Sequence, residues 1–281
     1  MKKRMSLPTL LGMKKESRPI TMLTAYNFWQ ARLADEAGAD MLLVGDSLGM
    51  VEHGFPGTLP VTMEMMITHC SAVMRAQPAA FVVGDMPFMS YEACDLDAVT
   101  NAGRMVKESG VDAVKIEGGI DRVDRISAIV KAGVAVVGHI GLTPQSVTLL
   151  GGYRVQGKDE AGARKLLRDA LAIQDAGAFC LVLECVPDGV AEVISKKLRI
   201  PTIGIGAGPG CDGQVLVFHD VVTLYGSFKP RFVKRYLDGG DRIREGLKGY
   251  VEEVRSGVFP DDDHSFAADP AVRAALEDSG L

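Results

Sequence analysis

Residues 113–138, AVKIEGGIDRVDRISAIVKAGVAVVG, contain one complete strand–helix–strand unit. The two outer runs, Ala113–Ile116 and Ala135–Gly138, are short, apolar and rich in β-branched residues, which is typical of buried strands. Between them, Val123–Ala132 places apolar residues at helical spacing. Strands that are apolar on both faces belong to a parallel sheet covered by helices, so this unit predicts an α/β fold.

The same unit recurs along the whole chain. The predicted strands are Ile20–Thr24, Met41–Val44, Phe81–Val83, Ala113–Ile116, Ala135–Gly138, Cys180–Leu183, Thr202–Ile205 and Val215–Phe218. The predicted helices between them include Asn27–Ala37, Met63–Ala76, Leu96–Glu108, Val123–Ala132, Ala161–Ala176 and Val190–Lys197. Several of these helices lead into a glycine, as at Gly38, Gly110 and Gly177, where a left-handed residue stops the helix before the next strand.

Eight predicted strands favour a closed barrel over an open doubly wound sheet, and no G-x-G-x-x-G motif follows the first strand to indicate a dinucleotide fold. The chain has 281 residues, close to the ~250 of a typical TIM barrel. No internal linker is rich enough in proline, serine or charge to separate a second domain. We therefore expect a single (β/α)8 TIM barrel domain over residues 1–281, with its core at about 18–256 and a tail at 257–281.

Further helices are expected outside the barrel. Ser6–Ser17 predicts a short N-terminal helix that is capped by its first residue. Arg231–Lys234 and Arg242–Val254 predict helices after the eighth strand. Asp269 followed by Pro270 is a helix start, with a capping residue and then a proline in the first turn. These segments add a short N-terminal helix and a C-terminal helical extension to the barrel.

Composition excludes several classes of protein. Apolar residues make up 47% of the chain and charged residues 24%, which is ordinary for a globular protein and excludes extended disorder, a collagen-like repeat and a disulfide-stapled miniprotein. The formal net charge of −5 supplies no broad basic face, so no nucleic-acid partner is expected. No window reaches the ~18 uncharged apolar residues of a membrane span, and no apolar stretch follows the basic start as in a signal peptide.

Cysteine usage indicates a reducing compartment. The five cysteines have no C-x-x-C or zinc-type spacing; they are Cys70, Cys94, Cys180, Cys185 and Cys211. We expect free, buried cysteines that serve as small hydrophobic residues. A cytoplasmic location is therefore expected.

Ionisable residues end five consecutive predicted strands. Asp46, Asp85, Glu117, His139 and Glu184 each close or follow an apolar run, about one strand–helix unit apart. In a TIM barrel the carboxyl ends of the strands carry the active site, while the interior is packed. We therefore expect these side chains to converge on one mouth of the barrel.

Asp46, Asp85 and Glu117 are the predicted metal ligands. Three carboxylates brought together in a low-dielectric site repel one another unless a cation lies among them. Oxygen ligands without a His or Cys cluster indicate Mg²⁺, with one ion expected per subunit. The alternative is that each carboxylate caps a following helix or turn.

Lys115, His139 and Glu184 are candidates for binding and proton transfer. Lys115 lies two residues before Glu117, so strand alternation sends both side chains to the same face, where the lysine could anchor a substrate carboxylate or enolate, or form a structural ion pair. His139 could polarise a carbonyl or exchange a proton as an auxiliary group, or be a hydrogen-bonded core histidine. Glu184 ends a strongly apolar strand and suits a general base for a carbon acid; the alternative is a pair with Lys115 or a buried arginine.

Eight sequence motifs follow one another along nearly the whole chain. They are Thr24-Ala25-Tyr26, Val44-Gly45-Asp46-Ser47-Leu48-Gly49-Met50, Asp85-Met86-Pro87-Phe88, Val114-Lys115-Ile116-Glu117-Gly118-Gly119, Gly138-His139-Ile140-Gly141-Leu142-Thr143-Pro144-Gln145-Ser146, Gly152-Tyr153-Arg154-Val155-Gln156-Gly157-Lys158, Leu183-Glu184-Cys185-Val186-Pro187 and Ile203-Gly204-Ile205-Gly206-Ala207-Gly208. With these motifs the chain resembles the ketopantoate hydroxymethyltransferase family. The resemblance implies a (β/α)8 barrel that uses Mg²⁺ and 5,10-methylenetetrahydrofolate to hydroxymethylate 3-methyl-2-oxobutanoate. The product would be 2-dehydropantoate, in pantothenate and coenzyme A biosynthesis.

The resemblance also implies residue roles. It implies Asp46, Asp85 and Glu117 as the metal set, and Glu184 as the proton acceptor. The implied substrate contacts are Asp46, Ser47, Asp85 and Lys115. A cytoplasmic homo-oligomer acting on small molecules is implied as well, commonly a decamer of two pentamers.

On this hypothesis a cation stabilises an enolate, Lys115 and Ser47 hold the acid, and Glu184 removes the C3 proton. The alternative is a Mg²⁺-dependent 2-oxo acid lyase or mutase of the phosphoenolpyruvate-mutase kind. Such enzymes normally place a reactive cysteine or a phosphate-handling loop near the metal, and no cysteine of this chain lies in a comparable motif. A third hypothesis is a non-catalytic barrel that senses a metabolite, but a protein that only binds its ligand would not need Glu184.

Overall fold

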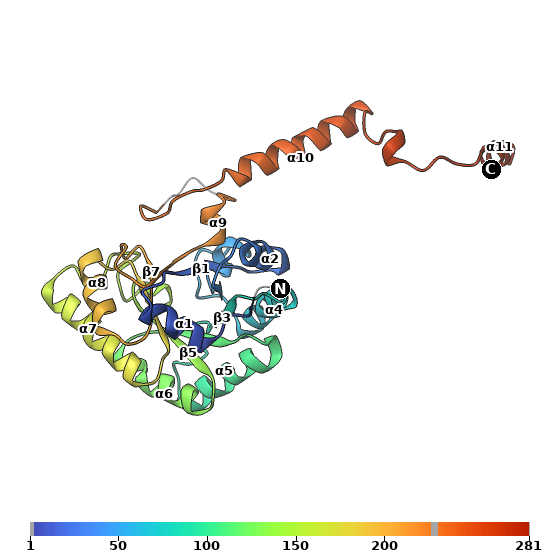
Figure 1. Ribbon diagram of the computed structural model, residues 1–281. Coiled ribbons are helices and arrows are strands. Elements are labelled where there is room, and N and C mark those ends of the chain that lie inside the picture. Colours follow the sequence, from blue (N-terminus) through green and yellow to red (C-terminus); the bar gives the residue numbers. More distant parts are fainter. Residues whose placement is uncertain (1–2, 226–229, 281) are drawn as a thin grey trace.

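Eight parallel strands form a closed barrel in chain order (Figure 1). The computed structural model describes residues 3–225 and 230–280. The strands are β1 (Ile20–Thr24), β2 (Met41–Val44), β3 (Phe81–Asp85), β4 (Ala113–Glu117), β5 (Ala135–Gly141), β6 (Cys180–Glu184), β7 (Thr202–Ile205) and β8 (Gly213–Leu216). Because β8 pairs with β1, the sheet has no edge, and the predicted TIM barrel is confirmed.

Helices between the strands form the outer layer of the barrel (Figure 1). They are α2 (Phe28–Glu36), α4 (Met63–Arg75), α5 (Asp95–Ser109), α6 (Val123–Lys131), α7 (Glu160–Asp175) and α8 (Asp188–Lys197). The loops also hold single turns: α3 (Leu48–Val51), η1 (Ile120–Arg122) and η2 (Pro144–Ser146). In the described part of the chain, no helix is long and apolar enough to cross a bilayer.

Strand alternation separates two apolar cores, one inside the barrel and one between strands and helices. On β4, Ala113 belongs to the inner core, whereas Val114 and Ile116 belong to the outer core. Lys115 and Glu117 therefore share the inward face of the strand with Ala113, as their spacing predicts.

The helix α1 (Leu7–Lys15) closes the N-terminal end of the barrel. Its first turn is capped by Ser6, whose Oγ accepts a hydrogen bond from the Thr9 backbone N–H. Leu10 and Met13 pack against the inner core. The opposite end, where the carboxyl ends of the strands meet, is the one that carries the ionisable residues.

Two predicted boundaries after the seventh strand were wrong. The last strand ends at Leu216, because Phe218 begins the short helix α9 (Phe218–Val221) and the apolar run continues from one element into the other. The predicted helix Arg231–Lys234 is a single turn followed by extended chain, closed by a hydrogen bond from Val233 N–H to the Pro230 carbonyl.

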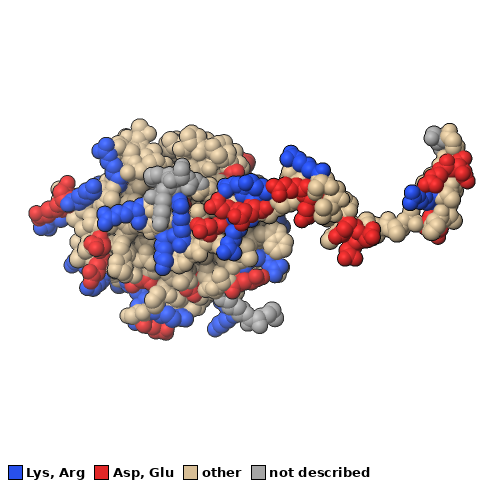
Figure 2. Space-filling view, turned by 90° about the horizontal axis from the view of Figure 1, so that it is seen from above, with Lys and Arg blue, Asp and Glu red and all other residues tan. Residues whose placement is uncertain are grey.

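The C-terminal extension runs away from the barrel (Figures 1 and 2). It comprises α10 (Gly239–Ser256), the turn η3 (Asp262–His264) and α11 (Pro270–Glu277). The predicted helix Arg242–Val254 lies within α10, and Asp269 caps α11 as expected, accepting a hydrogen bond from Ala271 N–H. The exposed apolar side chains Ile243, Leu247, Tyr250 and Val254 recur at helical spacing along one side of α10.

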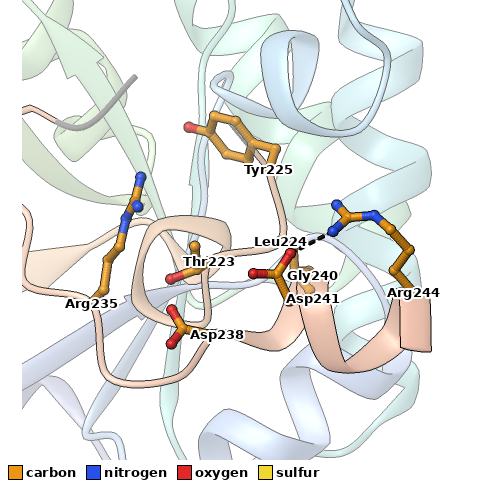
Figure 3. A pocket seen from close by; sticks show the side chains of 8 residues that line it. All are labelled: Thr223, Leu224, Tyr225, Arg235, Asp238, Gly240, Asp241 and Arg244. Atoms are coloured by element: carbon orange, nitrogen blue, oxygen red, sulfur yellow. Dashed lines mark hydrogen bonds and ion pairs between the residues drawn. The ribbon is translucent and has the colours of Figure 1, made fainter. Parts of the chain in front are cut away.

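A cavity of about 340 Å³ lies where α10 leaves the barrel (Figure 3). Its lining residues are Thr223, Leu224, Tyr225, Arg235, Asp238, Gly240, Asp241 and Arg244. An ion pair between Asp241 and Arg244 forms part of its wall. None of the predicted site residues lines this cavity.

All five cysteines are free, as predicted, but they differ in burial. Cys70 and Cys180 are buried, Cys185 and Cys211 are half-buried, and Cys94 is exposed. The expectation of burial was wrong for Cys94 because this residue caps α5, where its Sγ accepts a hydrogen bond from Asp97 N–H.

Candidate active site

The ionisable strand-end residues converge on one mouth of the barrel. Asp85 ends β3, Glu117 ends β4 and Glu184 ends β6, while His139 lies on β5 and Asp46 follows β2 directly. The strand register sets Asp85 beside Lys115 and Glu117 beside His139. Asp46, Asp85, Lys115, Glu117 and His139 are all less than 5% exposed, whereas the Glu184 side chain is 17% exposed and therefore nearest to solvent.

Lys115 is the central cation of this cluster. Its Nζ lies 2.8 Å from Asp85 Oδ1, 3.9 Å from Glu117 Oε1 and 3.2 Å from His139 Nδ1. Burial lowers the pKa of Lys115, but the surrounding carboxylates outweigh it and raise the pKa above its ordinary value. Lys115 is therefore a buried ammonium group.

His139 lies between two carboxylates. Its Nδ1 is 3.3 Å from Glu117 Oε1, and its Nε2 is 3.2 Å from Glu184 Oε2. Burial and the Lys115 ammonium lower the pKa of His139, but the neighbouring carboxylates of Glu117 and Glu184 raise it to about 9. Nδ1 also lies within hydrogen-bond distance of Lys115 Nζ, and Nε2 makes no hydrogen bond among the described residues, so the ring lies between the two carboxylates without being hydrogen-bonded to Glu184.

Asp46 and Asp85 form a buried acidic pair. The Asp46 backbone N–H donates to Asp85 Oδ2 at 3.2 Å. Burial raises the pKa of Asp46, and the charges of Asp85 and Glu117 raise it further. Burial likewise raises the pKa of Asp85 despite the nearby Lys115. Two buried carboxylates with raised pKa values are a site where added positive charge would be stabilising.

Glu117 has a different environment from the acidic pair. Burial would raise its pKa, but the hydrogen bond and charge of His139, together with Lys115, lower it. Its Oε2 also accepts a hydrogen bond from the Gln145 backbone N–H at 3.0 Å. Glu117 is thus a carboxylate already stabilised by protein groups.

Two buried polar residues of the site, Gln145 and Tyr91, were not predicted as functional. Gln145 Nε2 donates to Asp46 Oδ2 at 2.9 Å, and Tyr91 OH donates to Gln145 Oε1 at 2.6 Å. Both lie in loops, where no regular spacing of apolar residues indicates which side chains are buried. Gln145 was visible only as part of the motif that follows His139.

Ser47 lies beside Asp46 at the start of α3 and is held by Tyr26. The phenol oxygen of Tyr26 is 2.8 Å from Ser47 Oγ. Tyr26 is fully buried, and burial raises the pKa of its phenol, so the group remains a neutral hydrogen-bonding partner. The sequence identified Ser47 but not the role of Tyr26 in orienting it.

The acidic residues suit a divalent cation held by two direct ligands better than one held by three. Within residues 3–225 and 230–280, no group of three or more His, Cys, Asp or Glu side chains is arranged to hold a metal ion. Mg²⁺ usually takes one or two carboxylates and completes its shell with water or substrate oxygens. Asp46 and Asp85 fit that pattern, because they are two buried carboxylates at neighbouring strand ends, joined by the hydrogen bond from Asp46 N–H to Asp85 Oδ2 and balanced nearby by the Lys115 ammonium, 2.8 Å from Asp85 Oδ1.

Solved structures of other proteins share this fold. Phosphonopyruvate hydrolase, described in complex with oxalate and Mg²⁺, superposes with a TM-score of 0.62 at 12% identity, over 98% of this chain and 96% of that one. The 2,3-dimethylmalate lyase, described as a member of the PEP mutase/isocitrate lyase superfamily, superposes with a TM-score of 0.61 at 17% identity, over 98% of this chain and 100% of that one. At such low identity these similarities show the barrel architecture alone.

Sequence comparison is far more specific. A protein of Moorella thermoacetica named 3-methyl-2-oxobutanoate hydroxymethyltransferase is 56% identical over 263 residues, covering 94% of this chain and 98% of that protein. A protein of the same name from Heliobacterium modesticaldum is 52% identical over 273 residues, covering 97% and 99%. The family model described as ketopantoate hydroxymethyltransferase matches residues 4–262, which include the barrel and every residue of the cluster. From this match and these identities, the chain belongs to the ketopantoate hydroxymethyltransferase family.

Proposed function

We propose that this protein transfers a hydroxymethyl group from 5,10-methylenetetrahydrofolate to 3-methyl-2-oxobutanoate, forming 2-dehydropantoate. The observation that carries the proposal is the arrangement of an acidic pair, a buried lysine and a more exposed glutamate at one barrel mouth, in a chain of this family. Water supplies the oxygen of the new hydroxymethyl group, and tetrahydrofolate is the second product. The lyase or mutase alternative has only the shared fold in its favour.

Asp46 and Asp85 are the residues that would hold Mg²⁺ directly, with Glu117 in an indirect role. When bound there, a divalent cation would polarise the keto group of the 2-oxo acid and so favour loss of its C3 proton. The charge of the site fits this assignment. Among the described residues, the cations beside the carboxylates of Asp46, Asp85, Glu117 and Glu184 are Lys115 and, when protonated, His139, so the ionised cluster has an excess of negative charge in either state of the histidine.

The protein's own residues bind and deprotonate the substrate in this proposal. Lys115 and Ser47 hold the carboxylate of the 2-oxo acid, because an ammonium group and a hydroxyl are the nearby donors for it. Glu184 accepts the C3 proton, since it is the carboxylate nearest to solvent and to an incoming second substrate. His139 lies beside Glu184, with its Nε2 3.2 Å from Glu184 Oε2.

We also propose a homo-oligomer, with a decamer as the expected form, and a cytoplasmic location. The exposed apolar side of α10 supports association, since such a surface is stabilised when another chain covers it. Sedimentation velocity of Leu247→Glu should show smaller species than the wild type. Arg242→Gln, which makes the same change in charge on another side of α10, should sediment as the wild type does.

The activity is tested by incubating the purified protein with 3-methyl-2-oxobutanoate, Mg²⁺ and 5,10-methylenetetrahydrofolate. We expect 2-dehydropantoate to form and to require all three additions. Product formation without the folate, or cleavage of the 2-oxo acid, would favour the lyase or mutase alternative instead.

A further inference from the structure

Gln145 connects three strands of the active-site mouth although it lies in a loop. It is part of η2 and is only 5% exposed. Its side-chain Nε2 donates to Asp46 Oδ2 and to the Met86 carbonyl, both at 2.9 Å. Its backbone N–H donates to Glu117 Oε2 at 3.0 Å. Gln145, which lies in the loop after β5, thus contacts one residue that follows β2, one that follows β3 and the last residue of β4.

The orientation of the Gln145 amide is fixed by its partners. Nε2 faces two acceptors, so the reverse orientation would set Oε1 against the Asp46 carboxylate and the Met86 carbonyl. On the other side, Oε1 accepts a hydrogen bond from Tyr91 OH at 2.6 Å. Only one orientation of the amide satisfies all three groups.

Tyr91 connects the end of β4 to the Gln145 amide by hydrogen bonds. The Glu117 backbone N–H donates to Tyr91 OH at 3.0 Å, which occupies a lone pair of the phenol oxygen. The hydroxyl hydrogen has two acceptors within reach, and Gln145 Oε1 at 2.6 Å is much closer than the Glu117 carbonyl at 3.3 Å. Tyr91 is 1% exposed, and burial raises the pKa of its phenol well above the usual value, so the hydroxyl keeps its proton. The hydrogen bonds therefore run in one direction, from β4 through Tyr91 and Gln145 to Asp46.

We infer that Gln145 is a positioning residue that orients the Asp46 carboxylate for a divalent cation, and that Tyr91 acts through it. Asp46 follows β2 rather than lying within it, so strand pairing does not fix its side chain. A carboxylate held at one oxygen by an amide presents its other oxygen to a ligand. This inference rests on the proposed function, which assigns the cation to Asp46 and Asp85.

The test measures the affinity of the full-length protein for Mn²⁺, which suits the same oxygen ligands as Mg²⁺ and is detected directly by electron paramagnetic resonance. Gln145→Met keeps an unbranched side chain but removes the amide. Tyr91→Phe removes only the hydroxyl. The matched control is Gln174→Met, because Gln174 is also buried (7% exposed) but accepts its hydrogen bond from Arg199 N–H, between α7 and the loop after α8.

We expect Gln145→Met to raise the Kd for Mn²⁺ roughly 10–100-fold, the usual effect of removing a group that orients a metal ligand. Tyr91→Phe should raise the Kd by a smaller factor, and this effect should be nearly absent when Gln145 is already Met. Gln174→Met should lower the melting temperature but leave the Kd within twofold of the wild type. A purely structural role for Gln145 predicts instead that it behaves as Gln174 does.

The inference is overturned if folded Gln145→Met binds Mn²⁺ within twofold of the wild type, or if the wild type binds no Mn²⁺. If Gln145→Met does not fold, the Kd of Tyr91→Phe for Mn²⁺ is the deciding measurement. A Kd equal to that of the wild type in Tyr91→Phe also overturns the inference. The proposed function fails separately: a wild type that binds Mn²⁺ but forms no 2-dehydropantoate refutes the activity and leaves the positioning role intact.

Discussion

Nε2 of His139 lies 3.2 Å from Oε2 of Glu184, while Nδ1 of the same ring faces Glu117 from 3.3 Å. The ring therefore lies between the ends of β4 and β6, within reach of both carboxylates. Of these two carboxylates Glu184 is the more exposed, with 17% of its side chain accessible against 3% for Glu117, which supports the proposal that Glu184 is the base.

Replacing Glu184 with Gln should slow exchange of the C3 proton of 3-methyl-2-oxobutanoate for deuterium by roughly 10²–10⁴-fold, the usual contribution of a positioned base. Proton NMR in deuterated buffer with Mg²⁺ measures this exchange without the folate. Glu192→Gln, on the exposed surface of α8, is the control and should exchange at the wild-type rate. Full-rate exchange in Glu184→Gln would exclude Glu184 as the base.

Replacing Lys115 with Met should lower the free energy of unfolding by about 3–5 kcal/mol, because it leaves buried carboxylates without their cation. Urea unfolding in EDTA measures the loss. Adding Asp85→Asn should recover part of it, since the neutral amide no longer needs the ammonium group. A double variant that is less stable than Lys115→Met alone would contradict the ion pair.

His219 should make the protein less stable in mild acid. Burial lowers the pKa of this histidine below its usual value, and its Nδ1 is buried without a hydrogen-bond partner among the residues that the structure describes. The unfolded chain then binds the proton more readily, so stability that is present above about pH 6.5 is lost as the pH falls below it. Urea unfolding from pH 8 to pH 5 should show a shallower loss in His219→Gln.

Gly141 should tolerate no side chain. Its φ is +98°, and a Cβ atom there would lie 2.2 Å from the Glu184 carbonyl oxygen. Gly141→Ala should therefore lower the free energy of unfolding by about 2–5 kcal/mol through strain and overpacking, and should reduce activity by displacing Glu184. Gly103→Ala, within α5 and with no atom within 4 Å of the added carbon, should instead stabilise the protein by about 0.5–1 kcal/mol. Thermal and urea unfolding of both variants provide the comparison.

The strands and the mouth residues were predictable because the barrel repeats one local pattern. Each apolar run forms a strand, and the polar residue that ends it lies at the carboxyl end, as Asp85 and Glu184 do. The spacing of Lys115 and Glu117 gave their shared inward face because side chains alternate along a strand. The limits of the last strand were missed because apolar residues continue into α9.

Gln145 and Tyr91 could not be predicted in the same way. They lie 54 residues apart and meet only after the barrel closes. A buried polar residue in a loop belongs to no periodic sequence pattern, and its role depends on hydrogen-bond partners that come from other strands. The direction of α10 was equally hidden, because periodicity predicts a helix and its apolar side but not what that side contacts.

Because α1 packs against the inner core at the N-terminal end of the barrel, the two substrates of the proposed reaction would both approach from the opposite end. Asp46 and Asp85 are more buried there than Glu184, so on that proposal the small 2-oxo acid would have to bind before the much larger folate covers it. We therefore expect compulsory-order kinetics, with the acid binding first and the folate product leaving first. Inhibition patterns with tetrahydrofolate and 2-dehydropantoate test this sequence, and patterns of random addition would argue against it.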